Sequence, residues 1–110
     1  MPGVYCFEDR KTHKKYIGQS SNVERRIKEH IKKLKNNEDN APKLQEAYNN
    51  NSKFNIFILQ YEPNYQRRVA LEQYYINKYD TINNGLNTLT SCSDGRIERI
   101  ESMYNITVPV

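Results

Sequence analysis

Residues 3–18 read GVYCFEDRKTHKKYIG and contain the pattern that decides the fold. Two short apolar runs, at 3–8 and 14–18, flank a charged stretch, which predicts an antiparallel hairpin with a polar loop. Side chains alternate along a strand, so Tyr5 and Tyr16 can project from the same side of the sheet if the register permits. A glycine shares the face of each tyrosine and leaves room for another backbone or a ligand.

The remaining sequence predicts helices around one more strand. A helix follows the capping residues Ser20-Ser21-Asn22 and extends to about Lys35, and a shorter helix starts at Pro42 and ends at 49–51. A strand is expected over 54–61 and a further helix over 65–79. A turn follows at 83–87, and the tail is expected to hold a Ser/Thr-rich loop and a short helix. The strand at 54–61 is apolar on both alternating faces, which predicts helices on both sides of it. The expected fold is therefore α/β in the α+β sense, with a small, mostly antiparallel three-stranded sheet sandwiched by helices.

Length and composition indicate one domain in a reducing compartment. The chain has 110 residues, enough to bury a core without staples. Its two cysteines, Cys6 and Cys92, have no paired spacing, so neither a disulfide framework nor a zinc site is expected. No apolar run approaches the roughly 20 residues that cross a bilayer, and the N-terminus lacks a signal-peptide profile. We expect an intracellular protein without a membrane partner, in the cytoplasm, in the nucleus, or inside the host cell if the chain is viral.

The net charge of +4 is concentrated in one predicted helix. Segment 22–36 carries six basic and two acidic side chains, so it holds the whole excess. Such a stripe can attract a polyanion and contact its phosphates. A solvated basic helix face explains the charge equally well, and charge alone leaves both interpretations open.

Glu72 is the strongest single candidate for chemistry. It lies among apolar residues, which fall within about 60° of it on the helical wheel: Tyr65, Val69, Tyr75, Ile76 and Tyr79. A carboxylate in such a stripe is costly to bury unless a cation or hydrogen-bond donors meet it. From the residues alone, a metal ion and a structural ion pair with a buried arginine remain equally plausible.

Arg26 and His30 are four residues apart, so they lie on one helical row that Lys33 extends. This row borders the apolar arc, as expected for side chains at the rim of a cleft. A guanidinium there could stabilise the charge of a phosphoryl transition state. Arginine and lysine on a solvated face are the ordinary alternative.

The two tripeptides Gly3-Val4-Tyr5 and Tyr16-Ile17-Gly18, followed by Arg26, His30, Glu72 and an asparagine in a Gly-Leu-Asn turn, resemble the catalytic core of the GIY-YIG nucleases. The resemblance implies a catalytic domain over 1–90 and a C-terminal extension over 91–110, too short for a separate DNA-recognition domain. The stretch Lys43-Leu44-Gln45 and the following strand look most like phage-type homing endonucleases. Those relatives often carry a histidine where this chain has Asp39.

The resemblance also implies roles. The catalytic set is Tyr5, Tyr16, Arg26, His30, Glu72 and Asn87, and the DNA contacts come from Lys14, Lys15 and Lys33. Glu72 would bind Mg²⁺, with Mn²⁺ as a substitute. We expect Tyr5 to accept the proton of an attacking water and Tyr16 to orient that water, with the opposite allocation open. Either role requires nearby cations, namely Lys14, Lys15, Arg26 and the metal, to lower a tyrosine pKa.

The function that this set predicts is a metal-dependent endonuclease acting on DNA, alone, as a homodimer, or with a separate DNA-recognition protein. A catalytically inactive nucleic-acid-binding module with the same fold is the alternative, and a protein-interaction domain with a basic helix is a third. A degenerate binder tends to lose the glutamate or arginine first, whereas every core position is filled here.

Overall fold

The computed structural model describes residues 1–88. In chain order the elements are β1 (Gly3–Asp9), β2 (Lys15–Ser20), α1 (Val23–Lys35), α2 (Pro42–Asn49), β3 (Phe54–Tyr61), α3 (Tyr65–Lys78) and α4 (Thr81–Asn84). The predicted hairpin, helices and third strand are thus confirmed to within a few residues at each end. The expected turn at 83–87 begins inside α4. The domain boundary at 90 and the short helix expected in the tail lie outside the described residues.

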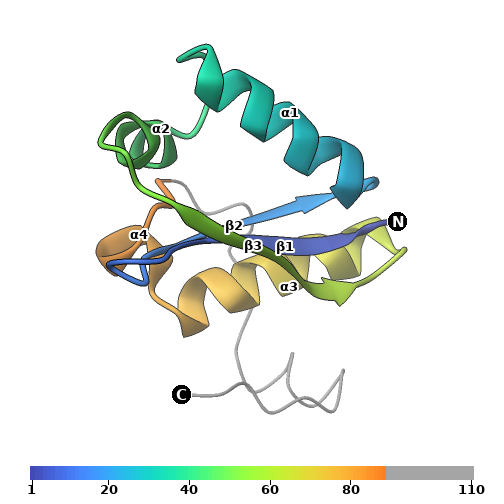
Figure 1. Ribbon diagram of the computed structural model, residues 1–110. Coiled ribbons are helices and arrows are strands. Elements are labelled where there is room, and N and C mark those ends of the chain that lie inside the picture. The colour runs from blue at the N-terminus through green and yellow to red at the C-terminus, as the bar shows by residue number, and fades with distance from the viewer. Residues whose placement is uncertain (89–110) are drawn as a thin grey trace.

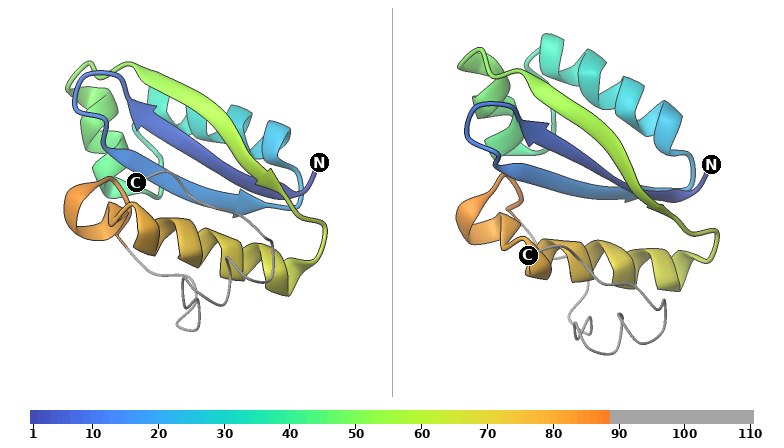
Figure 2. Two further views of the ribbon diagram at one scale, coloured as in Figure 1. Left: turned by 90° about the horizontal axis from the view of Figure 1, so that it is seen from below. Right: turned by 60° about the horizontal axis from the view of Figure 1, so that its bottom comes forward.

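The three strands form one antiparallel sheet in the order β2-β1-β3. Helices α1 and α2 cover one face of this sheet, and α3 with α4 covers the other (Figure 1). The predicted α+β sandwich is confirmed. β1 pairs with both other strands, so it is the central strand, and β2 and β3 form the two edges (Figure 2).

The register of the hairpin places the two tyrosines on one face, as predicted. Tyr5 pairs with Gly18 and Phe7 pairs with Tyr16. A Cβ atom added at Gly18 would overlap the phenol ring of Tyr5. Glycine is therefore required here because the Tyr5 ring crosses the sheet directly over this position, on its way toward α1.

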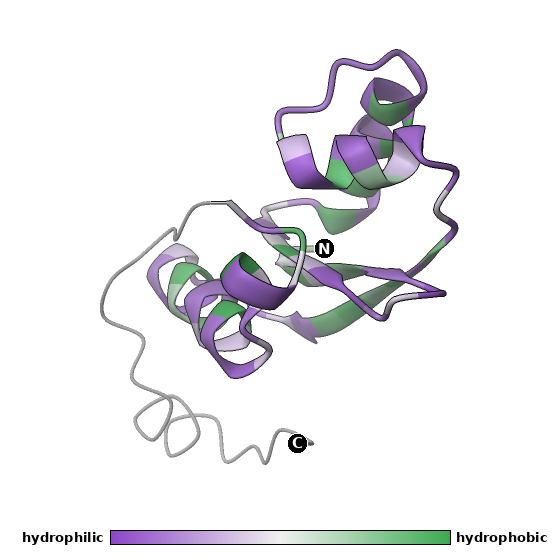
Figure 3. Cartoon of the chain, turned by 90° about the vertical axis from the view of Figure 1, so that its left-hand side faces the viewer, coloured by the Kyte–Doolittle hydropathy of each residue, from purple (hydrophilic) through white to green (hydrophobic). Residues whose placement is uncertain are grey.

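Two separate cores hold the layers together. The core between the sheet and α3 contains Val4, Cys6, Ile17, Leu71, Tyr74, Tyr75 and Ile76. The core on the other side contains Tyr5, Phe7, Val23, Leu34, Ala41, Leu44 and Leu86. Figure 3 shows hydrophobic stretches beside hydrophilic ones in the strands, and mixed colouring along the helices, as expected for amphipathic helices around a sheet.

The prediction that helices cover β3 on both sides is wrong. β3 is an edge strand, and Ile56 and Phe57 are 37% and 38% exposed. The helices pack mainly over β1 and β2, and β3 reaches the two cores through partly buried residues such as Ile58 and Leu59. A continuous apolar run here therefore reflects partial contact with both cores and not full burial.

Capping side chains fix where the two long helices begin. The Asn22 side chain accepts a hydrogen bond from the Arg25 backbone N–H at 3.1 Å, and Ser20 braces Asn22. Asn64 caps α3 in the same way by accepting from the Arg67 backbone N–H at 2.9 Å. These bonds satisfy helix N–H groups that lack an intrahelical partner. Among residues 1–88, no helix is long and apolar enough to cross a membrane.

Candidate active site

A cavity of about 180 Å³ lies beside β2. Its walls come from β2, α1, α3 and two loops, and consist of Tyr16, Ile17, Arg26, His30, Asn40, Ala41, Glu72, Ile76, Asn87 and Thr88. Because β2 is an edge strand, side chains from the helix layers on both faces of the sheet can meet next to it. The topology thus brings together residues that are far apart in sequence.

Asn87 closes the outer edge of β2. Its Oδ1 accepts from the Ile17 backbone N–H at 2.8 Å, and its Nδ2 donates to the Ile17 carbonyl at 2.9 Å. The side-chain amide therefore pairs with β2 as a neighbouring strand would. Thr81 donates its hydroxyl to Asn87 Oδ1 at 2.8 Å, and Lys43 donates to the Asn87 carbonyl at 3.2 Å. Asn87 is buried, and its amide is held from both sides.

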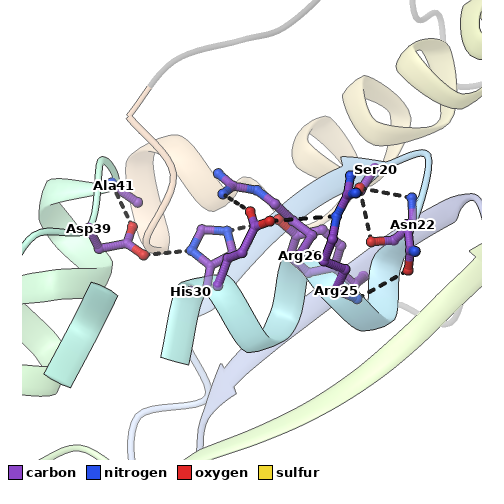
Figure 4. Close-up of polar contacts among 9 residues, drawn as sticks. Ser20, Asn22, Arg25, Arg26, His30, Asp39 and Ala41 are labelled. Atoms are coloured by element: carbon purple, nitrogen blue, oxygen red, sulfur yellow. Dashed lines mark hydrogen bonds and ion pairs between the residues drawn. The ribbon is translucent and has the colours of Figure 1, made fainter. Parts of the chain in front are cut away.

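Arg26 and His30 project from one side of α1, as their spacing predicted (Figure 4). The guanidinium of Arg26 lies at the cavity wall and contacts Glu29 Oε2 at 3.3 Å. Burial alone would lower the pKa of Arg26, but the neighbouring Tyr5 and the hydrogen bond to Glu29 raise it overall. Arg26 thus remains charged beside the cavity.

His30 is the middle residue of a chain of polar contacts that joins Tyr5, His30 and Asp39. Its Nε2 is 2.8 Å from the Tyr5 hydroxyl, and its Nδ1 is 2.6 Å from Asp39 Oδ2. Burial lowers the pKa of His30, partly opposed by Asp39 and reinforced by Arg26 and Lys33. A neutral His30 accepts from Tyr5 through Nε2 and donates to Asp39 through Nδ1–H.

Tyr5 and Tyr16 pack against His30 with ring centroids 5.8 and 5.4 Å from it. Burial raises the pKa of Tyr16 to about 12, with a further contribution from Glu72 and opposition from Arg26. Burial and Tyr16 raise the pKa of Tyr5 far above its ordinary range, again opposed by Arg26. Among the protein's own groups, burial therefore outweighs the opposing charge of Arg26 at both phenols. The expectation that cations including the metal ion lower a tyrosine pKa stays a prediction.

Glu72 projects from α3 into the same cavity wall and is 9% exposed. Its negative charge raises the pKa of both tyrosines, which shows that its carboxylate lies within electrostatic reach of them. Glu72 therefore belongs to the cavity with Tyr16 and Arg26, although α3 packs on the opposite face of the sheet from α1.

The GIY-YIG catalytic domain matches residues 1–87. The chain belongs to the GIY-YIG family. Two solved structures are similar to it: the catalytic domain of the homing endonuclease I-TevI, and a mutant of the catalytic domain of the same intron endonuclease. Each aligns with a TM-score of 0.77 and 25% identity, covering 81% of this chain and 99% or 94% of the other chain, respectively. No curated protein matches the chain.

The GIY-YIG match shows that the protein is a nuclease whose domain is like that of a homing endonuclease. This favours the enzyme over the inactive binding module and over the protein-interaction domain. Five of the six predicted catalytic residues line the cavity: Tyr16, Arg26, His30, Glu72 and Asn87. Tyr5 lies behind them, only 1% exposed, and reaches the site through its hydrogen bond to His30.

The three lysines predicted to bind DNA are differently placed. Lys33 is half-buried on α1 and lies near enough to His30 to lower its pKa. Lys14 is exposed in the hairpin loop. Lys15 pairs with Glu8 at 3.2 Å and lies 5.0 Å above the Tyr79 ring. None of the three lysines lines the cavity of the GIY-YIG site.

Two residues of the site were not found from the sequence. Thr81 supports Asn87, but a threonine at the start of a short helix carries no distinctive signal. Asp39 appeared only as a departure from the relatives, where a histidine is frequent. Its contact with His30 depends on the loop between α1 and α2, whose path cannot be derived from local pattern.

Proposed function

We propose that this GIY-YIG nuclease hydrolyses the phosphodiester backbone of DNA at the cavity beside β2, with a divalent metal ion held by Glu72. One observation carries the proposal: Tyr16, Arg26 and Glu72 line a single cavity, although they come from a strand and from helices on opposite faces of the sheet. The likeness to the catalytic domain of a homing endonuclease supports DNA as the substrate.

The cavity suits a hard divalent cation. Glu72 offers carboxylate oxygens at the wall of a cavity of about 180 Å³. In residues 1–88 no group of three or more His, Cys, Asp or Glu side chains is placed to hold a metal ion. An ion bound here would therefore take its other ligands from water and substrate phosphate, which is how Mg²⁺ is commonly held, and Mn²⁺ should substitute. When bound, it would act as a Lewis acid toward a phosphate oxygen and the leaving oxygen.

The protein's own groups position the water and move its proton. Tyr16 lines the cavity and is the phenol that can contact an attacking water, whereas Tyr5 is buried behind it. A hydrogen bond to Tyr5 favours ionisation of Tyr16. Tyr5 in turn contacts His30. The sequence of contacts from the cavity to Tyr16, Tyr5 and His30 favours Tyr16 as the residue that contacts the water and Tyr5 as the residue that passes a proton to His30. This allocation is the reverse of the first expectation.

Arg26 supplies positive charge where the phosphorane develops negative charge. Its guanidinium stays ionised at the cavity wall, and a fixed cation in a partly dry site stabilises such charge strongly. Lys33, on the same helix, would contact a neighbouring phosphate. One such site per chain makes a single nick the natural product of one engagement, so a double-strand cut would require a homodimer, a recognition partner or repositioning.

Plasmid relaxation tests the proposal. Supercoiled DNA should be nicked with Mg²⁺ or Mn²⁺, and EDTA should stop the reaction. Glu72→Gln keeps the shape of the side chain and removes its charge, so nicking should fall by about 10²-fold or more. Glu46→Gln makes the same change at an exposed position on α2 and should leave nicking unchanged.

Two results would contradict the proposal. If the wild-type protein nicks no form of DNA with either metal, DNA is not its substrate. If Glu72→Gln nicks at the rate of the wild type, Glu72 does not hold a metal ion that the reaction needs.

A further inference from the structure

The carboxylate of Asp39 is enclosed at the inner end of the polar chain. The side chains of Asp39 and His30 are each only 1% exposed, and they meet at 2.6 Å (Figure 4). Asp39 Oδ1 accepts from the Ala41 backbone N–H at 2.9 Å, and the Asp39 backbone N–H donates to Gln45 Oε1 at 3.0 Å. Both carboxylate oxygens and the loop that carries them are therefore fixed.

This enclosure determines which nitrogen of His30 carries a proton. A carboxylate only accepts hydrogen bonds, so the ring nitrogen that faces Asp39 must be Nδ1–H. In neutral imidazole the other nitrogen then holds a lone pair, and Nε2 points it at the Tyr5 hydroxyl 2.8 Å away. Without Asp39, nothing in these contacts would prevent His30 from carrying its proton on Nε2.

We propose that Asp39 is a positioning residue of the nuclease, which holds His30 in the Nδ1–H form so that Nε2 receives the proton of Tyr5 during water attack. The inference rests on the proposed function, since it concerns the proton released at that site. Asp39 does not touch the substrate. It acts through His30, in the manner of a carboxylate that orients a catalytic imidazole.

The chain's own groups carry the proton that the attacking water releases. As the water oxygen bonds to phosphorus, the bond from phosphorus to the leaving sugar oxygen breaks, and that oxygen takes the electron pair and gains a proton from solvent. A proton of the attacking water moves to the Tyr16 oxygen, the Tyr16 proton moves to the Tyr5 oxygen, and the Tyr5 proton moves to His30 Nε2. Both phenols end neutral, and His30 becomes an imidazolium paired with the Asp39 carboxylate. The proton returns to solvent after product release. No tyrosinate has to exist before the reaction, which agrees with two phenols that burial keeps protonated.

The surroundings of His30 support this direction of transfer. Its charged and titratable neighbours are Tyr5 from β1, Tyr16 from β2, Arg26 and Lys33 from its own helix, and Asp39 from the following loop. Burial, reinforced by the two cations, lowers the pKa of His30, so the resting imidazole is neutral and ready to accept a proton. Asp39 is the one group in this set that stabilises the imidazolium once it forms.

Asp39→Asn tests the proposal because the two oxygens of Asp39 have different partners. The asparagine Oδ1 keeps the bond from the Ala41 N–H, which leaves its Nδ2–H₂ facing His30 Nδ1. A donor at that position requires a lone pair on Nδ1, so the ring proton moves to Nε2 and points at Tyr5. The substitution preserves shape and inverts the tautomer.

Nitrogen NMR and kinetics give independent readouts. In the wild type, the ¹⁵N spectrum should show a protonated Nδ1 and an unprotonated Nε2 for His30, and His13→Gln assigns the other histidine. Asp39→Asn should exchange the two. The kcat for nicking should fall by about 10²-fold or more, with KM unchanged, since Asp39 does not line the cavity. Glu38→Gln removes the same charge from the adjacent exposed residue and should change neither.

The wild-type spectrum alone can overturn the proposal, since a proton on Nε2 would contradict it even if Asp39→Asn failed to fold. Unchanged kcat in a variant with the inverted tautomer would overturn it as well. In a His30→Ala background, Asp39→Asn should cost nothing further, and an additive loss would assign Asp39 a purely structural role. If Glu72→Gln abolishes nicking and Asp39→Asn does not, the proposed function stands and this inference falls.

Discussion

Replacing Asn87 with alanine should weaken the fold far more than the loss of one exposed side chain would. The amide makes three buried hydrogen bonds: from the Ile17 N–H at 2.8 Å, to the Ile17 carbonyl at 2.9 Å, and from the Thr81 hydroxyl at 2.8 Å. Alanine leaves all three partners without this amide, at about 1 kcal/mol or more each. We therefore expect a loss of about 3 kcal/mol, a large share of the roughly 5–15 kcal/mol that holds a domain together.

Urea unfolding monitored by circular dichroism measures this loss. The midpoint should fall while the slope stays constant, because the variant exposes the same surface on unfolding. Asn83→Ala is the matched control: its amide bonds the Asp80 carboxylate at 3.0 Å in an exposed position, so its effect should stay within about 0.5 kcal/mol. Thr81→Val removes one of the three bonds and should fall between the two. If Asn87→Ala costs no more than Asn83→Ala, the amide does not serve as the missing strand partner of β2.

Three further predictions concern the site. Gly18→Ala should cost about 1–3 kcal/mol and lower kcat, because the new Cβ displaces the Tyr5 phenol; wild-type unfolding and nicking values would contradict the overlap. The pKa of His30 in the folded protein lies below its ordinary value, so unfolding takes up a proton at pH values between the folded and the unfolded pKa. Stability and nicking should both decline as the pH falls through this range, and the His30→Gln variant should not show this decline. Lys33→Ala should reduce the slope of log binding constant against log salt by about one unit, whereas Lys15→Ala, which breaks a pair with Glu8, should change it less; equal slopes would place both lysines on the DNA.

The predictions that the structure confirms depend on neighbours in sequence. The hairpin, the capped start of α1 and the shared face of Tyr5 and Tyr16 follow from alternation and capping, which act over a few residues. Glu72 could also be selected from the sequence, because a carboxylate in an apolar stripe conflicts with its surroundings, and the structure places it in the cavity wall. Its role in metal binding stays a prediction.

The features that escaped prediction depend on how layers meet. An apolar run on both faces does not reveal whether a strand is central, and β3 proved to be an edge strand. The depth of Tyr5 relative to Tyr16 depends on where α1 lies over the hairpin, so the sequence could not rank the two phenols. Asp39 meets His30 only because the loop after α1 folds back.

The position of the site at an edge strand explains why one residue, Asn87, both stabilises the sheet and lines the cavity. In a sheet covered on both faces, side chains from the two helix layers can meet beside the outermost strand, which is where Arg26 and Glu72 converge. That same edge leaves backbone groups of β2 without a neighbouring strand, and unpaired groups there are costly or prone to pairing with other chains. Asn87 satisfies those groups at Ile17 while forming part of the cavity wall. A fourth strand beside β2 would satisfy the outer backbone groups of β2 without Asn87, but it would also lie between Arg26 and Glu72. The site therefore depends on β2 being the edge of the sheet.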